Sequence, residues 1–193
     1  MADPTTNISD FKAALPYGGA RPTLFDFQIS SYGIANAGPA AFGDMRLTCN
    51  VSAIPALTVT PIERVYFGRT VKIPGDMVFA DLTTSFINTE DYSVRNEIEV
   101  WMNEINGHST NLTDLLNTTG GWQGTGTLTQ YSKDGKSLMV YTFVGLWPQT
   151  IAEIALSYDT VSDIETYDVT WSYNYYTTKK GTATTAASNS ANV

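Results

Sequence analysis

Apolar and polar residues alternate with a period of two along several stretches of this chain, and this alternation limits the fold more than any other feature. It is clearest over residues 166–176, where bulky apolar side chains occupy every second position. Residues 23–31 and 44–52 show the same pattern. Successive side chains of a strand point to opposite sides of its sheet, so we predict that each stretch is a half-buried strand of an antiparallel sheet.

Further strands are predicted where the alternation is weaker. Residues 138–144 are apolar on both faces, as expected of a strand covered on both sides by a second sheet or by a neighbouring subunit. Asp134-Gly135 precedes that segment and predicts a hairpin with residues 127–131. Residues 76–88 form another predicted strand. We therefore expect a mainly β fold of two packed antiparallel sheets, a β-sandwich or partial barrel.

One α-helix is predicted to flank these sheets. It covers residues 91–105, with Thr89 as its N-cap, acidic residues near its start and Gly107 as its stop signal. Apolar positions spaced by 4, 3 and 4 residues give it a single stripe, which we expect to pack on a sheet. The stripe consists of Val94, Ile98, Trp101 and Ile105.

Composition divides the 193 residues into one folded domain with two tails. Residues 1–20 lack sustained periodicity and are predicted to be a flexible arm, while residues 177–193 are a low-complexity tail. The predicted domain spans residues 21–176 between them. No 18-residue apolar run and no N-terminal signal segment stand out, so we expect a soluble, unexported protein with no membrane partner.

Charge and rare residue types argue against several functional classes. Asp and Glu number 19 and Lys and Arg 11, and the resulting net charge of −8 disfavours a nucleic-acid-binding surface. A single cysteine, Cys49, and a single histidine, His108, cannot form a Cys/His zinc site. The glycine-rich segment 120–126 lacks the Lys-Ser/Thr ending of a phosphate-binding loop. We therefore expect no catalytic residues, no metal and no cofactor, and predict that the chain is not an enzyme.

Read in order, several segments of the predicted domain resemble the tail tube proteins of T4-like contractile-tailed bacteriophages. The order and spacing of these segments hold over most of residues 21–176. The matching segments are RPTLFDFQI (21–29), TCNVSAIPA (48–56), VKIPGDMVFADLT (71–83), the helix 91–105, VGLWP (144–148) and residues 156–176. The resemblance implies a non-enzymatic structural subunit that is assembled in the cytoplasm of the bacterial host and resides in the tail of the virion.

The family resemblance also implies a mode of assembly. Hexameric rings would stack into the rigid inner tube of a tail, with the strands of six subunits joined in one continuous β-barrel. Phage DNA would pass through the lumen without specific binding, and the implied partners are further copies of the chain, tail sheath, baseplate hub and tail terminator proteins. A hexamer would carry a net charge of 6 × −8 = −48, and an acidic lumen wall would let DNA slide without adhering.

Residues 54–74 are predicted to form a hairpin, and the resemblance implies that it contacts the next ring. Its charged residues are expected to set the stacking register, and its apolar residues to supply contact area. The charged ones are Glu63, Arg64, Arg69 and Lys72, and the apolar ones are Val65, Tyr66 and Phe67. A plain hairpin that stays within its own ring is the alternative.

Short polar faces of two predicted strands are the candidates for lining the lumen. They are Asp81, Thr83 and Ser85 in one strand, and Thr125, Thr127 and Thr129 in the other. A register slip of one residue would invert this assignment, because it exchanges the two faces of a strand. Residues 33–43 depart from the family pattern and are interpreted as an extension of the first hairpin.

Two other classes of function stay open at this stage. Tube subunits of phage-derived injection devices and of type VI secretion machines resemble this family in fold, and those devices carry no DNA. The aromatic stripe of Trp171, Tyr173 and Tyr175 is also compatible with a β-sandwich module that binds carbohydrate or decorates a virion. At strand spacing, however, such a stripe is more often part of a core.

Overall fold

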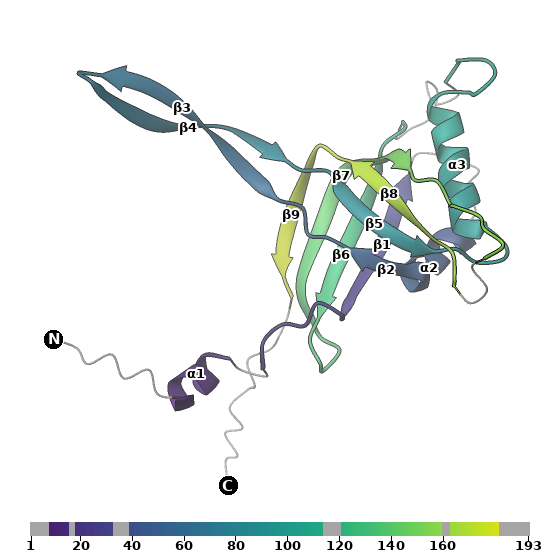
Figure 1. Cartoon of the computed structure of the whole chain (residues 1–193), viewed down its shortest axis with the longest axis horizontal. Helices are drawn as coiled ribbons and strands as arrows, with labels where there is room; N and C mark the ends of the chain where they lie inside the picture. The colour runs from purple at the N-terminus through teal and green to yellow at the C-terminus, as the bar shows by residue number, and fades with distance from the viewer. Residues whose placement is uncertain (1–7, 16–17, 33–38, 114–120, 160–162, 182–193) are drawn as a thin grey trace, which may run out of the picture.

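The structure, a computed structural model, describes residues 8–15, 18–32, 39–113, 121–159 and 163–181. Within these ranges the chain forms a body of two antiparallel sheets, with a long hairpin projecting from one end and helix α3 (Ser93–Ile105) lying at the other (Figure 1). None of the helices in the described ranges is long and apolar enough to span a membrane.

Strand β7 (Ser137–Ile151) belongs to both sheets. Its first half pairs with β6 (Gly124–Tyr131) and β9 (Tyr175–Lys180), and its second half pairs with β8 (Thr166–Ser172). The change of partner occurs at Gly145, whose φ of 73° lies in the left-handed region that a side chain disfavours. A single continuous strand therefore links the two layers of the body.

The remaining strands extend the sheets away from β7. The first sheet has the order β1-β6-β7-β9, with β1 covering Phe25–Tyr32. The second sheet has the order β2-β5-β8-β7, with β2 at Cys49–Ser52 and β5 at Leu82–Ile87. The hairpin that projects from the body consists of β3 (Leu57–Tyr66) and β4 (Arg69–Phe79).

Aromatic side chains fill the space between the two sheets. The ring of Phe27 on β1 lies 6.4 Å from Phe86 on β5 and 6.0 Å from Trp171 on β8, centroid to centroid. Trp101 of α3 adds a third layer, 6.0 Å from Trp171. The inner faces of the sheets therefore pack against each other, which confirms the predicted sandwich of two antiparallel sheets with a flanking helix.

The predicted helix is present, but it begins two residues later than predicted. α3 begins at Ser93 after Tyr92, whose φ is 52°, rather than at a Thr89 cap. Thr89 instead donates a hydrogen bond to the Asp91 carboxylate, which also accepts the backbone N–H of Ser93. The helix ends at Ile105, shortly before Gly107. Of the predicted stripe, the buried members are Val94, Ile98 and Trp101, and Ile105 is partly buried against the core.

The prediction of a strand over residues 44–52 is wrong for most of its length. Helix α2 (Pro39–Thr48) occupies its first part, and β2 begins only at Cys49. A strand would turn Met45 and Leu47 to the same side, but Met45 is fully buried whereas Leu47 is 83% exposed. In a segment this short, two alternating apolar residues fit a helix as well as a strand. Of the expected hairpin extension, residues 33–38 lie outside the described ranges, and α2 occupies the rest.

Two long strands predicted from alternation are each split in the structure. The segment 76–88 is divided at Ala80-Asp81 between β4 of the hairpin and β5 of the body. The segment 166–176 is divided at Tyr173-Asn174, where the chain passes from the second sheet to the first. Burial does not continue through either break: Met77 and Val78 before the first are about half exposed, and after the second Tyr176 rather than Tyr175 packs against the core.

The expected boundaries differ at both ends from the structure. Helix α1 (Ile8–Ala14) lies in the expected flexible arm, although none of its residues is buried. Strand β9 continues to Lys180, beyond the expected boundary at residue 176, because Met139 and Val140 of β7 pair with Lys180 and Lys179. The hairpin predicted at Asp134-Gly135 joins β6 to β7, with Gly135 at a φ of 74°.

Candidate functional site

The β3–β4 hairpin extends away from the body and, apart from its root, packs only on itself in the described ranges (Figure 1). Its turn residues Phe67 and Gly68 have φ values of 46° and 77°, the paired positive values of the two-residue turn that suits the twist of a hairpin. At the root, Phe79 packs edge-to-face on Tyr173 and Tyr176, and this aromatic group fixes the hairpin to the body.

The cross-strand register assigns the outer half of the hairpin to two faces, because directly opposed residues of an antiparallel pair lie on the same side. We call them the isoleucine face and the ion-pair face. The isoleucine face consists of Ile62, Arg64, Tyr66, Arg69, Val71 and Ile73. The ion-pair face consists of Pro61, Glu63, Val65, Thr70, Lys72 and Pro74.

The four charged residues of the predicted stacking segment are thereby separated into two pairs. Lys72 Nζ lies 3.4 Å from Glu63 Oε1 on the ion-pair face, where both side chains are solvent-exposed. Arg64 and Arg69 lie on the isoleucine face, and neither has a carboxylate within 4.0 Å among the described residues. The sequence indicated which residues carry charge, but not which of them neutralise each other.

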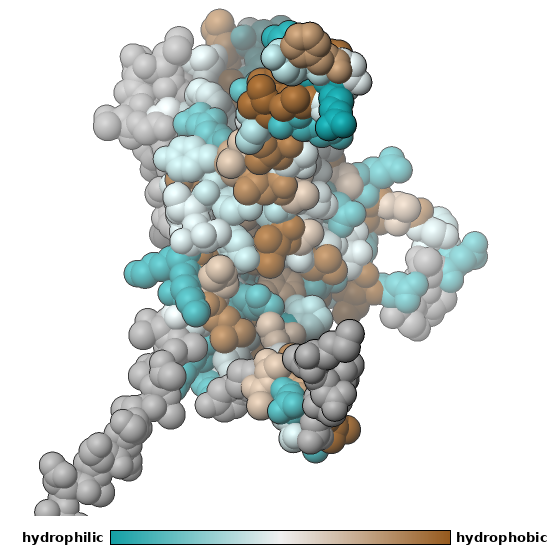
Figure 2. All heavy atoms as spheres, turned by 90° about the vertical axis from the view of Figure 1, so that its left-hand side faces the viewer, coloured by the Kyte–Doolittle hydropathy of each residue, from teal (hydrophilic) through white to brown (hydrophobic). Residues whose placement is uncertain are grey.

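The apolar residues of the segment gather at the tip of the hairpin. Val65 is 77% exposed and Phe67 is 89% exposed. The rings of Tyr66 and Phe67 contact each other edge-to-face at 4.6 Å. Figure 2 looks onto the side from which the hairpin projects and shows apolar residues gathered near the top of the view and in a column beneath it. Contiguous exposed apolar surface of this kind marks an interaction site.

The two sets of residues predicted to line the lumen lie on different sheets. Thr125, Thr127 and Thr129 of β6 alternate with buried residues and therefore sit on the outer face of the first sheet. Thr83 and Ser85 of β5 do the same on the second sheet, and the exposed Asp81 precedes that strand. Because the inner faces pack together, the two outer faces point away from each other. The structure therefore does not bring the two sets together on one surface.

The outer face of the first sheet is polar but nearly neutral. One row across it, in register, is Gln28, Thr127, Thr142 and Thr177. The neighbouring row contains Asp26, whose carboxylate lies 2.5 Å from Nε of Arg46, and Lys179 at its far end. The described residues of these two rows therefore supply no unpaired carboxylate to an acidic wall.

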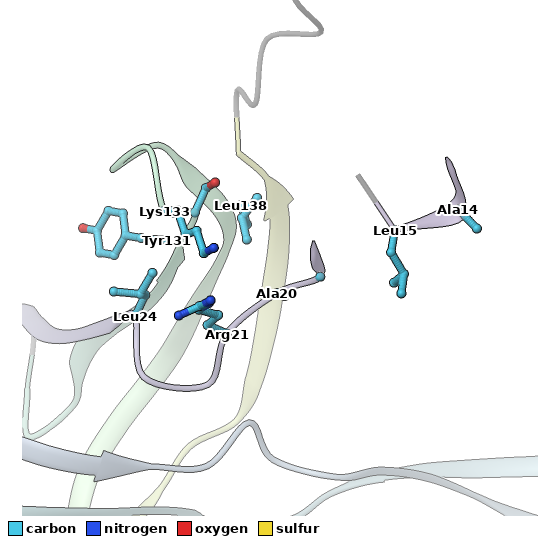
Figure 3. Close-up of a pocket in the computed structure, with 10 residues that line it drawn as sticks. Ala14, Leu15, Ala20, Arg21, Leu24, Tyr131, Lys133 and Leu138 are labelled. Carbon is cyan, nitrogen blue, oxygen red and sulfur yellow. The ribbon is translucent and has the colours of Figure 1, made fainter. Parts of the chain in front are cut away.

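A cleft of about 260 Å³ separates the N-terminal arm from the body (Figure 3). Ala14 and Leu15 lie on one side of it, and Leu24, Tyr131 and Leu138 lie on the other. Ile8 and Phe11 of α1 are exposed beyond this cleft. The arm therefore presents apolar side chains that the described part of the body does not cover.

The residues considered for chemistry are not organised into a reactive site. Burial is the main cause that raises the pKa of the Cys49 thiol to about 12, and the Asp26 carboxylate adds to this shift, so the thiol stays protonated at neutral pH. No cluster of three or more His, Cys, Asp or Glu side chains suited to a metal ion occurs in the described ranges. The backbone N–H of His108 donates a hydrogen bond to Asn103 Oδ1.

Two of the three residues of the aromatic stripe, Trp171 and Tyr173, are part of the core, and only Tyr175 is half exposed. Trp171 is fully buried and donates its indole N–H to Thr84 Oγ1 at 2.8 Å. The Tyr173 ring packs on Phe143 at 5.0 Å. A stacking platform has to present its ring faces to solvent, so the carbohydrate-binding interpretation of this stripe is wrong.

Comparisons with known proteins agree in pointing to one family. The family model described as phage tail tube protein matches residues 12–179. Tail tube protein gp19 of Enterobacteria phage T4 is 27% identical over 175 residues, which covers 88% of this chain and 98% of the relative. Tail tube protein gp19 of Enterobacteria phage T6 matches with the same identity and coverage.

Solved structures share the fold at lower identity. A chain of the sheath–tube complex of an extracellular contractile injection system, PVC, in its extended state has a TM-score of 0.60 at 15% identity, covering 91% of this chain and 99% of that one. A chain of the anti-feeding prophage cap has a TM-score of 0.59 at 13% identity, covering 84% and 91%. These likenesses establish that the two-sheet body is a fold found in tube assemblies.

Proposed function

We propose that this chain, which belongs to the phage tail tube protein family and is a structural subunit of a phage tail, assembles into hexameric rings. These rings stack into the inner tube of a contractile tail. The family and the non-enzymatic role predicted from the sequence are confirmed. The observation that carries the proposed assembly is the hairpin, which exposes apolar residues that its own body does not cover.

An isolated two-stranded hairpin is at best marginally stable in water, so this one needs a surface to pack on. Burying a large apolar side chain such as Val65 or Phe67 contributes about 1.5–3 kcal/mol when burial is complete. The described body offers contacts only at the root, through Phe79. The proposed partner is a subunit of the adjacent ring, which the hairpin contacts through its tip residues Val65, Tyr66 and Phe67 and through one of its two charged faces.

Ring closure is supported by the edges of the first sheet. Among the described strands, β1 pairs only with β6, and β9 pairs only with β7, so each has one free edge. Free edges invite pairing with another chain unless they are protected. In the proposed ring, β9 of one copy lies beside β1 of the next, and the six sheets form a continuous barrel.

In such a barrel we assign Thr125, Thr127 and Thr129 to the lumen, because they lie on the outer face of the sheet with the two free edges. The set Asp81, Thr83 and Ser85 then lies on the outside of the wall. The lumen wall proposed here is neutral and rich in hydroxyl groups rather than acidic. DNA would meet few charges of either sign along it.

The outside of the tube and its ends are the proposed contacts for other tail proteins. The names of the related solved structures place such chains in complexes with a sheath and with a tube terminator. We extend these contacts, and one to a baseplate hub, to this chain. The exposed residues of α1 are available for them, since the described body leaves Ile8 and Phe11 uncovered.

The test is electron microscopy of the purified full chain at increasing concentration, with light scattering beside it. We expect six-fold rings and hollow tubes. Phe67→Asn should shorten the tubes, because Asn favours the left-handed turn but removes the apolar tip. Tyr158→Asn is the matched control, since Tyr158 is fully exposed on the body. Particles that stay near 21.0 kDa at every concentration, even after isolated baseplates are added, would contradict the proposal.

A further inference from the structure

The two faces of the hairpin carry different net charges, although each bears two charged side chains. On the ion-pair face, Glu63 and Lys72 sit directly opposite each other and neutralise each other. On the isoleucine face, Arg64 lies opposite Val71 and Arg69 lies opposite Tyr66. This second face therefore carries two positive charges that the described chain does not balance.

The placement of these arginines is unfavourable in the free subunit. Arg69 is two residues from the partner of Arg64, so the two occupy diagonal positions on one face, roughly 7–8 Å apart at their backbones. Like charges at this spacing repel each other unless a counter-charge lies between them. Arg is also the side chain best suited to bind a carboxylate through two parallel hydrogen bonds.

The same face carries the apolar contacts that a docking surface needs. Ile62 and Ile73 face each other across the strands, and Val71 follows Ile73 toward the tip. All three side chains are about half exposed. This face therefore has the composition of an interface, because an apolar stripe supplies the core and the two arginines supply a charged rim.

We propose that the isoleucine face, and not the ion-pair face, docks the hairpin onto carboxylates of a second copy of this chain. This inference rests on the proposed stacking of rings. The occupant follows from charge complementarity: the chain carries −8 in total, so the part other than Arg64 and Arg69 carries −8 − 2 = −10. A second copy therefore carries an excess of carboxylates for which these two arginines can supply the counter-charge.

Charge reversal on each face tests whether the isoleucine face or the ion-pair face docks. In R64E/R69E, we expect rings to form but tube length in micrographs to fall at least tenfold. The matched control E63K/K72E exchanges the ends of the ion pair and keeps its charge balance, and its tubes should be as long as those of the wild type. Tubes of wild-type length from R64E/R69E, or short tubes from the control alone, would overturn the inference.

Cross-linking identifies the partner group directly. The R64K/R69K chain keeps both charges and adds amines that a carbodiimide couples to a contacting carboxylate. In tubes assembled from mixed ¹⁴N- and ¹⁵N-labelled copies, we expect mixed-isotope links from positions 64 or 69 to Asp or Glu. Lys72 serves as an internal control, since its link to Glu63 should stay within one copy. Intermolecular links from Lys72 alone, or none at all, would overturn the inference.

Two further outcomes distinguish this inference from its premise. If the wild-type chain forms no tubes even on baseplates, the proposed function fails, whereas tubes that tolerate R64E/R69E leave the function intact and remove only the docking face. DNA phosphates are the other ligand that two arginines could bind. A loss of DNA binding in R64E/R69E with unchanged tube length would assign the pair to nucleic acid and reject the carboxylate partner.

Discussion

The hydroxyl of Tyr173 donates a hydrogen bond to the carbonyl of Ala80 at 2.6 Å. Ala80 lies where β4 of the hairpin gives way to β5 of the body, and Tyr173 lies where β8 gives way to β9. One hydrogen bond therefore joins the point where the chain enters the body from the hairpin to the point where it passes from the second sheet to the first. It holds the root of the hairpin to the seam between the two sheets.

Removing this bond should loosen the hairpin without opening the core. For Tyr173→Phe we expect a loss of about 0.5–1.5 kcal/mol in the free energy of unfolding, because the ring contacts remain and only the hydrogen bond is lost. Urea denaturation in dilute solution measures it. Tyr175→Phe, at a half-exposed ring on the neighbouring strand, is the control and should leave the free energy unchanged.

The bond between Trp171 and Thr84 should matter more, since it is fully buried. Thr84→Val keeps the shape of the side chain but leaves the indole N–H without an acceptor, at a cost of about 1–3 kcal/mol. Thr84→Ser keeps the hydroxyl and should recover most of this loss. A Thr84→Val variant as stable as the wild type would show that the hydroxyl acceptor contributes nothing to stability.

Alkaline pH should destabilise the fold through Tyr167. Burial is the main cause that raises its pKa to about 12, with the nearby Arg95 opposing and Glu99 adding to the shift. The unfolded chain releases the phenol proton near the ordinary pKa of about 10, whereas the folded chain retains it. The unfolded state is then favoured as pH rises, so stability is lost between pH 10 and 12.

Tyr167→Phe should therefore make the decline of stability above pH 10 shallower than in the wild type. At neutral pH the variant should be as stable or more stable, since the Tyr167 hydroxyl is buried without a hydrogen-bond partner. Urea midpoints from pH 7 to 11 check both points. Tyr158→Phe, at a fully exposed position, should follow the wild-type curve.

Gly145 should resist substitution, because β7 changes partner there. Ala at a φ of 73° costs about 1–3 kcal/mol, and its methyl group would in addition collide with the Asn174 side chain. Thermal unfolding should show the loss. Gly145→Ala combined with Asn174→Ala removes the collision but not the backbone strain, so it should recover only part. Full recovery would mean that the backbone conformation contributes nothing.

The sequence was a good guide to strands whose alternating residues meet one core. Residues 23–31 were predicted correctly because Phe27 and Ile29 face the same buried layer. It failed where tertiary contacts outweigh a short pattern, as in α2, which buries Met45 but sends Leu47 to solvent. It also joined β8 to β9, because apolar residues alternate in the sequence as far as Tyr175, although in the structure Tyr176 rather than Tyr175 packs against the core.

The charges of the hairpin were found in the sequence, but their pairing depends on register. Which residues oppose each other follows from the two-residue turn at Phe67-Gly68 and from the irregularity between Val59 and Pro61. At that irregularity Gly75 lies so close to the opposite strand that a methyl group would come within 2.6 Å of the Thr60 carbonyl oxygen. A Gly in an alternating run hints at such a bulge, but it does not say which partner residue is displaced.

The sharing of β7 between both sheets has a mechanical consequence. In a sandwich of two separate sheets, a force parallel to the layers is resisted only by side chains that slide past one another. Here such shear has to stretch the covalent backbone on both sides of Gly145 or break the hydrogen bonds that β7 makes with β6, β8 and β9. A wall built from copies of this subunit would therefore carry a force along its layers through the main chain rather than through side-chain packing.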